Sequence, residues 1–438
     1  MIFMDTNTNK AKVLVVGGGG REHAIVDALS RSSRVGKIFC APGNAGIAMQ
    51  AECVPIKDTN VAELADFAET QSIDLTVVGP ESALAAGIVD EFESRGLKIF
   101  GPSKAAAVIE SSKDFAKALM ARHNVPTAAY QTFSGYDEAL AYVREGKFPV
   151  VLKYDGLAAG KGVVIAEDLQ QADETLRDML LDDMFGHGKV VVEEFLTGPE
   201  FSFLCFVNGK EVVPMILAQD HKRAFDGDEG PNTGGMGAYT GLPFVNDEDE
   251  KYALEHIMKP VAAGMAEEGI PFRGVLYGGL MKTPDGIKVI EFNCRFGDPE
   301  TEVVLPALES DIYDIFLAVA EHRPIPEVKW DRKPHIGFVL ASRGYPGSYA
   351  KGFEIKGLKS LPDDVKVYHM GTSLALLGEG HEDFDGTGRS LVTSGGRVLM
   401  VLAGAPTLSE ARDKALGAVN SIDCDNLFHR TDIGHWAL

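Results

Sequence analysis

Basic side chains are scarce in this sequence. Its 438 residues hold 42 Lys and Arg against 64 Asp and Glu, a formal net charge of −22. Nucleic acids and anionic membranes attract basic surface, so we expect no nucleic-acid partner and no membrane partner. An anionic ligand must instead be met by a local group of Lys, Arg, backbone N–H groups or a metal ion.

Cysteines are few, and long apolar runs are absent. No C-x-x-C pair occurs, which excludes the usual zinc motifs, and no apolar run approaches membrane-spanning length. The N-terminal dozen residues lack the apolar core of a signal peptide. These features predict reduced thiols in a cytoplasmic protein. The five cysteines are Cys40, Cys53, Cys205, Cys294 and Cys424.

Two standard nucleotide motifs are also missing. Residues 12–32 predict a strand, a glycine turn ("GGGGREH") and a helix, whose N-terminal N–H groups suit a phosphate. A dinucleotide fingerprint needs glycine where Glu22 stands and an acid after the second strand, which ends "CAPGNAG". We therefore exclude NAD and expect a phosphate or phosphosugar site. The alternative is a glycine turn that only allows close strand–helix packing.

The distribution of strand and helix patterns predicts three regions. From about residue 11 to 103, short apolar strands ending in Gly or Pro alternate with helices, which is typical of a parallel, doubly wound sheet. Hairpin-like strand pairs follow, one of them joined by a Pro-Asp-Gly turn at 284–286. From about residue 330 the pattern indicates a smaller α+β domain.

The stretch "KYDGLAAGKGVVI", residues 153–165, places a Gly/Ala loop between two lysines and two apolar strands. Small residues let a backbone approach a polyphosphate, and such a loop can close as a lid. It lacks the residue order of a Walker A loop. A plain hairpin turn is the alternative, but Lys153 lies on an apolar strand and needs an anionic partner there.

The stretch "VIEFNCRFGDPE", residues 289–300, carries polar side chains two residues apart. Read as a strand, it places Glu291, Asn293 and Arg295 on one face. Glu291 and Asn293 offer the oxygen ligands that a hard cation prefers. Arg295 and Asp298 could hold a small zwitterion. The alternative, a buried Glu291–Arg295 ion pair, leaves Asn293 and the following "GDPE" unexplained.

Two further stretches carry weaker signals. Residues 190–200, "VVVEEFLTGPE", could offer backbone groups near Glu193 to a flat base and Glu200 to ribose hydroxyls, or could be an exposed acidic strand end. Residues 219–239 form a long glycine-rich loop typical of a functional site, with Lys222 and Arg223 available for phosphates. We interpret His221 as a hydrogen-bonded structural residue.

These motifs together identify a family. "GGGGREHA", "APGNAG", "VGPE", "DGLAAGKGV", "QDHKR", "GPNTGGMGAY", "EFNCRFGDPE" and "GYPG" occur in the order and spacing of the phosphoribosylamine–glycine ligase family of the ATP-grasp superfamily. The resemblance covers about residues 11 to 435. It implies an N-terminal Rossmann-like substrate domain (11–112), an ATP-grasp domain of two α+β subdomains (113–328, with a lid subdomain at about 125–192) and a C-terminal α+β domain (329–438).

The resemblance also implies an activity. ATP would phosphorylate the carboxylate of glycine, and phosphoribosylamine would attack the glycyl phosphate to give glycinamide ribonucleotide, the second step of de novo purine synthesis. Magnesium or manganese is the implied metal, and a monomer or weak dimer the implied assembly. The rivals are an ATP-grasp ligase that uses formate or bicarbonate, a non-catalytic nucleotide-binding protein, and a Rossmann oxidoreductase, which the incomplete fingerprint disfavours.

Site residues carry over from the family motifs by position. For ATP they are Lys113, Lys153, Gly160, Lys161, Gly162, Glu193, Leu196, Glu200 and Lys222. For the other substrates they are Gly18, Gly19, Glu22, Asn44, Arg295, Gly297 and Asp298. The metal ligands would be Glu291 and Asn293, and the catalytic residues Lys153, Arg295 and Asp220. Since the preceding strand, "GVLYGGLMK", offers no carboxylate opposite Glu291, we expect few protein ligands for the metal.

Overall fold

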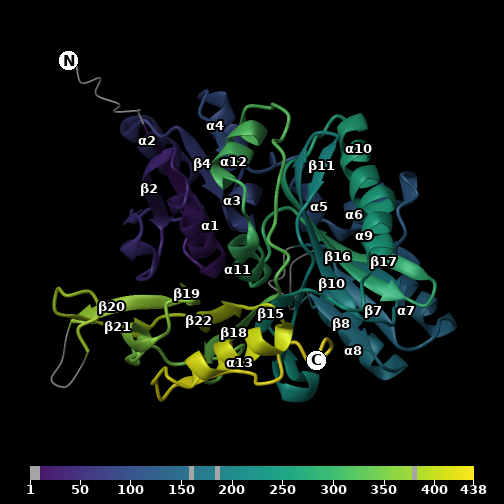
Figure 1. Cartoon of the computed structure of the whole chain (residues 1–438). Coiled ribbons are helices and arrows are strands. Elements are labelled where there is room, and N and C mark those ends of the chain that lie inside the picture. The colour runs from purple at the N-terminus through teal and green to yellow at the C-terminus, as the bar shows by residue number, and fades with distance from the viewer. Residues whose placement is uncertain (1–9, 157–161, 183–187, 377–381) are drawn as a thin grey trace. The chain divides into compact units, whose positions relative to one another are not determined.

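The structure, a computed structural model, describes residues 10–156, 162–182, 188–376 and 382–438. Its residues divide into two compact units (Figure 1). Unit 1 comprises Met1–Ser103, Met215–Leu242 and Arg295–Leu438. Unit 2 comprises Lys104–Pro214 and Pro243–Cys294. The chain therefore passes from unit 2 to unit 1 between Cys294 and Arg295, inside the motif that carries the predicted metal and glycine sites.

Unit 1 begins with a five-stranded sheet in the order β3-β2-β1-β4-β5, and all its pairings are parallel. Valines and a leucine make the middle of β1 fully buried, as a parallel sheet covered on both faces requires. The strands are β1 (Ala11–Gly17), β2 (Val35–Pro42), β3 (Glu52–Cys53), β4 (Leu75–Val78) and β5 (Ile99–Phe100). The helices between them are α1 (Gly20–Ser30), α2 (Val61–Gln71), α3 (Glu81–Ala86) and α4 (Ile88–Ser94).

The rest of unit 1 contains antiparallel strands in the order β12-β15-β18-β22-β19, with β23 beside β18. Helix α13 packs against β18 and β22, and its first turn is closed by Thr407 and Glu410 (Figure 1). The strands are β12 (Ala218–Asp220), β15 (Gly237–Thr240), β18 (His335–Ser342), β19 (Val365–His369), β22 (Arg397–Gly404) and β23 (Leu427–Phe428). Two hairpin pairs join β13 (Arg223–Phe225) to β14 (Glu229–Asn232) and β20 (Thr372–Leu376) to β21 (Arg389–Thr393). The helices are α11 (Glu300–Val304), α12 (Ile312–Ala320) and α13 (Leu408–Val419).

Unit 2 contains a four-stranded antiparallel sheet in the order β6-β9-β7-β8. Leu140, Val143 and Leu176 from helices α7 and α8 share a buried core with Leu152 and Val192 of the sheet. The elements are β6 (Tyr130–Phe133), α7 (Tyr136–Glu145), β7 (Val150–Tyr154), β8 (Val163–Ala166), α8 (Leu169–Leu180) and β9 (Val190–Glu194).

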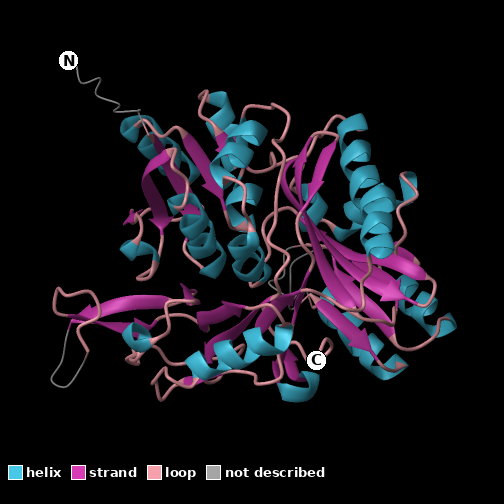
Figure 2. Cartoon of the chain, viewed as in Figure 1, coloured by secondary structure: helices cyan, strands magenta, loops and turns pink. Residues whose placement is uncertain are grey.

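A second group of antiparallel strands in unit 2 follows the order β17-β16-β10, with β11 beside β10. Residues 284–285 connect β16 and β17, so the predicted antiparallel hairpin is confirmed. The strands are β10 (Glu200–Asn208), β11 (Glu211–Pro214), β16 (Arg273–Thr283) and β17 (Gly286–Asn293). The helices, drawn in cyan in Figure 2, are α5 (Val108–Ser111), α6 (Lys113–Arg122), α9 (Asp247–Ala253), a π-helical turn (Leu254–Met258) and α10 (Lys259–Glu267).

The predicted fold class is confirmed. A parallel N-terminal sheet, antiparallel sheets with flanking helices, and a C-terminal α+β region all occur.

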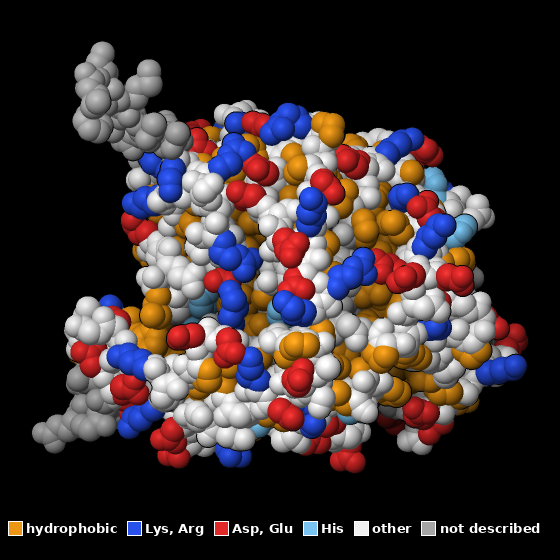
Figure 3. Space-filling model, in the orientation of Figure 1, with side chains coloured by type: hydrophobic (Ala, Val, Ile, Leu, Met, Phe, Trp, Pro, Cys, Tyr) orange, Lys and Arg blue, Asp and Glu red, His pale blue; other side chains and the backbone are white. Residues whose placement is uncertain are grey.

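Acidic and basic side chains are intermixed over the face drawn in Figure 3. No helix in the described ranges is both long and apolar enough to cross a membrane.

Candidate active site

Lys153 near the end of β7 has the anionic partner that its position demands. Its Nζ lies 3.0 Å from Oε1 of Glu193 on β9, and both side chains are buried. The same Nζ donates a hydrogen bond of 3.0 Å to the carbonyl oxygen of Ile290 on β17. The prediction that this lysine needs an anion is therefore confirmed, and the lysine joins the two groups of strands within unit 2.

Lys117 on α6 is a second buried lysine at this carboxylate, and it was not predicted from the sequence. Its Nζ lies 2.8 Å from Oε2 of Glu193 and donates to Oγ1 of Thr127 at 2.8 Å. Burial and, secondarily, the positive charge of Lys153 lower the pKa of Lys117 to about 8, although Glu193 opposes the shift. The available signal was its spacing: four residues after Lys113, Lys117 lies on the same face of the helix.

The N-terminus of α6 lies against the start of the predicted phosphate loop. Oδ1 of Asp155 accepts the backbone N–H of Asp114 at 3.1 Å, and Nζ of Lys113 donates to the carbonyl oxygen of Gly156 at 3.0 Å. Burial lowers the pKa of Lys113, while Glu291 opposes the shift. Lys113, Lys153, Glu193 and Glu291 are thus close enough to interact. Of the predicted loop residues, Gly162 is buried, whereas Gly160 and Lys161 lie outside the described residues.

Strand β17 supplies the two predicted metal ligands, Glu291 and Asn293. Gly279 lies opposite Glu291, and Leu280 pairs with Val289, which leaves Ile290 as a β-bulge. The expectation that no carboxylate faces Glu291 from the neighbouring strand is confirmed. Carboxylate and amide oxygens fit magnesium, which takes few protein ligands and completes its shell with phosphates and water.

One part of the strand prediction is wrong. β17 ends at Asn293, so Arg295 does not continue the same strand face. Nε of Arg295 lies 3.3 Å from Oε2 of Glu81, both within unit 1. The bulge and the following turn end the alternation on which the prediction was based. The carboxylate partner of Arg295 comes from a distant part of the sequence.

The residues predicted to bind the adenine base and the ribose of ATP lie where β9 leads into β10. Leu196 is half-buried between the two strands, and Glu200 is the first residue of β10. An open cavity of about 710 Å³ has Phe148 and Glu193 among its lining residues. Its volume is within the range of small-molecule sites.

In unit 1, the side chains of Glu22 and Asn44 hold the backbone of the glycine turn after β1. Oε2 of Glu22 accepts the N–H of Gly19 at 2.6 Å. Nδ2 of Asn44 donates to the carbonyl oxygens of Gly18 and His369 at 3.0 and 2.7 Å. A Cβ on Gly18 would lie 2.6 Å from the carbonyl oxygen of Gly43, so only glycine fits there. Glu22 and Asn44 therefore shape this turn.

The predicted glycine-binding residues Arg295, Gly297 and Asp298 lie between charged partners in unit 1. Burial raises the pKa of Glu81, but Arg295 and Arg21 outweigh it and the net pKa is lowered. On the other side, Arg397 Nη1 lies 2.9 Å from Oδ1 of Asp298. These charged partners, Arg21, Glu81 and Arg397, were not predicted from the sequence.

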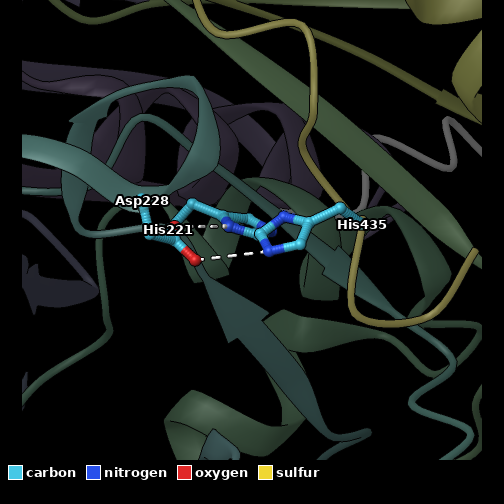
Figure 4. A group of neighbouring side chains, drawn as sticks. All are labelled: His221, Asp228 and His435. Carbon is cyan, nitrogen blue, oxygen red and sulfur yellow. Dashed lines mark ion pairs between the residues drawn. The ribbon is translucent and has the colours of Figure 1, made fainter.

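Asp220 and Lys222 stand at the end of β12 and just after it, and both are half-buried. His221 between them belongs to a separate cluster with Asp228 and His435 (Figure 4). Three ligand atoms within 4.8 Å of one another could hold a metal. However, Nε2 of His221 accepts the N–H of Gly434 at 2.9 Å, which places its proton on Nδ1, facing Asp228. This tautomer makes His221 a structural hydrogen-bonding residue, as predicted.

Glu302 on α11 provides a test of stability in unit 1. Its side chain is fully buried, and neither carboxyl oxygen has a hydrogen-bond partner in the described part of the chain. Burial, reinforced by Asp298, raises the pKa of Glu302 well above its usual range. A raised folded-state pKa means that stability is lost as pH rises from the unfolded value of about 4.3 through the folded value.

We therefore expect Glu302→Gln to stabilise the protein increasingly as pH rises, because the amide cannot ionise. The measurement is the thermal unfolding midpoint of both proteins between pH 5 and pH 9. Glu309→Gln, at an exposed position, is the control and should show no such trend. If the thermal unfolding midpoints of Glu302→Gln and wild type differed by the same amount at all pH values, Glu302 would not be a buried neutral acid.

The antiparallel sheets of unit 2, with buried lysines next to a strand bearing Glu291 and Asn293, define an ATP-grasp enzyme. Three models of phosphoribosylglycinamide synthetase match the chain: the N domain at residues 11–110, the ATP-grasp (A) domain at 111–301 and the C domain at 335–436. The phosphoribosylamine–glycine ligase of Halalkalibacterium halodurans is 49% identical over 428 residues, covering 97% of each chain. The chain belongs to the phosphoribosylamine–glycine ligase family.

Solved structures agree with this assignment. The phosphoribosylamine–glycine ligase of Thermotoga maritima has a TM-score of 0.83 and 31% identity, covering 97% of this chain and 100% of that chain. The biotin carboxylase domain of Hydrogenobacter thermophilus 2-oxoglutarate carboxylase, solved with MgADP, ADP and bicarbonate, has a TM-score of 0.71, with 15% identity over 95% of this chain and 91% of that chain. At that identity the second comparison shows a shared fold.

Proposed function

We propose that this ligase joins glycine to 5-phosphoribosylamine in two steps. The carboxylate of glycine attacks the γ-phosphorus of ATP, which releases ADP and gives glycyl phosphate. The amine of phosphoribosylamine then attacks the acyl carbon, and phosphate leaves as the amide forms. The observation that carries the proposal is the pair of buried lysines on Glu193, joined through Ile290 to the strand of Glu291.

The nucleotide is assigned to unit 2. Lys113, Lys153 and Gly162 contact the phosphates, and we propose a lid subdomain at about residues 125–192. Gly160 and Lys161 are also assigned to ATP and lie outside the described residues. The backbone of Glu193 and Leu196 meets the adenine edge, and Glu200 accepts from the ribose hydroxyls. Of the residues assigned to the nucleotide, Glu193 lines the open cavity of about 710 Å³. Lys222 is also assigned to ATP.

Glu291 and Asn293 would hold magnesium or manganese beside the phosphates. Such an ion neutralises charge that develops on the phosphoryl oxygens and fixes their orientation. The half-buried carboxylate and the buried amide provide hard oxygen ligands without a second protein carboxylate from the neighbouring strand. Their positions two residues apart at the end of β17 support this role.

The two other substrates are assigned to unit 1. Gly18, Gly19, Glu22 and Asn44 shape the phosphoribosylamine site, in which backbone N–H groups at the start of α1 suit the phosphate. Arg295, Gly297 and Asp298 form the glycine pocket. Arg295 would bind the carboxylate of glycine, because a guanidinium group suits a carboxylate, and Asp298 would bind its amine.

The catalytic residues we assign are Lys153, Arg295 and Asp220. Lys153 and Arg295 stabilise negative charge on the phosphoryl and carboxylate oxygens as the bond forms. Asp220 lies at the end of β12 and serves to orient the substrate. No general base is required, because the amine of phosphoribosylamine is largely neutral near pH 7, and no covalent enzyme intermediate forms.

ADP release with each substrate omitted in turn tests the proposed reaction. We expect release that depends on both glycine and phosphoribosylamine, because the acyl phosphate is consumed only by the amine. Replacing glycine by formate or bicarbonate should abolish turnover. Turnover with either replacement would favour the rival ATP-grasp reactions, and nucleotide binding without any turnover would favour a non-catalytic nucleotide-binding protein.

We further propose that the enzyme works in the cytoplasm as a monomer or weak dimer. The scarcity of cysteine and the absence of paired cysteine motifs support a reducing compartment. Sedimentation at several protein concentrations should give mainly the monomer mass. A stable larger assembly at the lowest concentration would contradict this assignment.

A further inference from the structure

Three buried charges in unit 2 do not balance. The side chains of Lys117, Lys153 and Glu193 are only 3%, 5% and 4% exposed. Each lysine lies within 3.0 Å of a different oxygen of the same carboxylate. Two positive charges and one negative charge leave one net positive charge out of water, which is costly unless an anion is bound there.

The two lysines have different surroundings. Lys117 is held on its other side by Thr127, whose hydroxyl donates to the carbonyl oxygen of Val289 at 2.7 Å. Lys153 donates to the next carbonyl oxygen along the chain, that of Ile290. Ile290 is the bulged residue of β17, so it has no partner residue on β16.

Lys153 has a donor left for a ligand. An ammonium group has three N–H donors, and among the residues that the structure describes Lys153 donates one hydrogen bond, to the carbonyl oxygen of Ile290, beside its ion pair with Glu193. The carboxylate of Glu193 is shared, so it cannot neutralise Lys153 fully. Lys117 therefore controls how much positive charge Lys153 offers.

We propose that Lys117 is a positioning residue for ATP: it holds one oxygen of Glu193, so that Lys153 keeps both its orientation and its surplus positive charge for the phosphates. This inference rests on the proposed function, in which Lys153 contacts those phosphates. Without Lys117, the remaining lysine and carboxylate form a neutral pair. Lys153 then binds Glu193 more tightly and the phosphates less tightly.

Variants that change the net charge around Lys153 distinguish this positioning role from a merely structural one. Lys117→Met leaves Lys153 neutralised by Glu193, whereas the double variant Lys117→Met/Glu193→Gln returns the surplus charge to Lys153. Gln keeps the backbone groups that are assigned to the adenine edge. Lys210→Met is the matched control, because Lys210 forms an ion pair with Glu267 in which both side chains are more than half exposed.

The dissociation constant of ADP with magnesium, measured by titration calorimetry on the full chain, is the readout, together with KM for ATP and for glycine. Lys117→Met should weaken ADP binding and raise KM for ATP by about tenfold or more, a typical cost of losing a group that orients a ligand residue. KM for glycine should stay unchanged. The double variant should recover most of the lost affinity, and Lys210→Met should match wild type.

Two results would overturn the proposal: unchanged ADP affinity in Lys117→Met, or a double variant that binds as weakly as the single one. If Lys117→Met fails to fold, the double variant against Glu193→Gln still decides the matter. In Glu193→Gln both lysines lack their carboxylate, and removing Lys117 should then leave ADP affinity unchanged or improved. Failure of the wild-type protein to bind ADP would instead count against the proposed function.

Discussion

Replacing Lys153 by Met is expected to lower kcat/KM about 10²–10³-fold, the range seen when one donor to a charged transition state is removed. Folding should suffer far less, because Glu193 keeps Lys117 as a partner 2.8 Å away and so is not left as an unpaired buried charge. We expect the thermal unfolding midpoint to fall by no more than about 5 °C. Steady-state kinetics and a melting curve on the same preparation measure both effects.

Lys259→Met is the control for this variant. Lys259 lies on α10 in the same unit and forms an exposed ion pair with Glu255, so its loss should change neither turnover nor the melting curve measurably. Wild-type turnover in Lys153→Met would remove the assignment of the 153–162 segment to phosphate binding. Loss of turnover with loss of the folded state would show that the lysine is needed for folding.

Replacing Glu291 by Gln is expected to raise the magnesium concentration required for half-maximal activity by at least about tenfold. The reason is the small number of protein ligands: Gly279 lies opposite Glu291, so the neighbouring strand offers no substitute carboxylate. The amide keeps the size of the side chain and one oxygen but loses the negative charge that a hard cation prefers. Activity titrated with magnesium at saturating ATP is the measurement.

Glu255→Gln, an exposed change on the same unit, should leave the magnesium titration unchanged. The alternative role of Glu291, an ion pair with Arg295, already has a competitor, because Arg295 lies 3.3 Å from Glu81. A magnesium titration of Glu291→Gln that overlays the wild-type curve would exclude Glu291 as a metal ligand. The metal site would then have to be sought elsewhere in unit 2.

Much of the fold could be predicted because it depends on local patterns. The apolar run of β1, the glycine turn and the amphipathic segment after it are adjacent in sequence, and so are the two strands joined through Pro284 and Asp285. The predicted elements therefore recur in the structure with small shifts of their ends. The β-bulge at Ile290 was not predictable, because it depends on the register with β16.

The sequence by itself determined the family, the order of the elements and the types of chemical group in the site. Its motifs alone predict that Lys153, Glu291 and Arg295 belong to the site. Only the tertiary structure decided which charges meet. Glu193 lies between Lys117 and Lys153, and Arg295 meets a carboxylate 214 positions away. The physical reason is that periodicity specifies which face of an element a side chain occupies, whereas charge partners depend on which elements fold against one another.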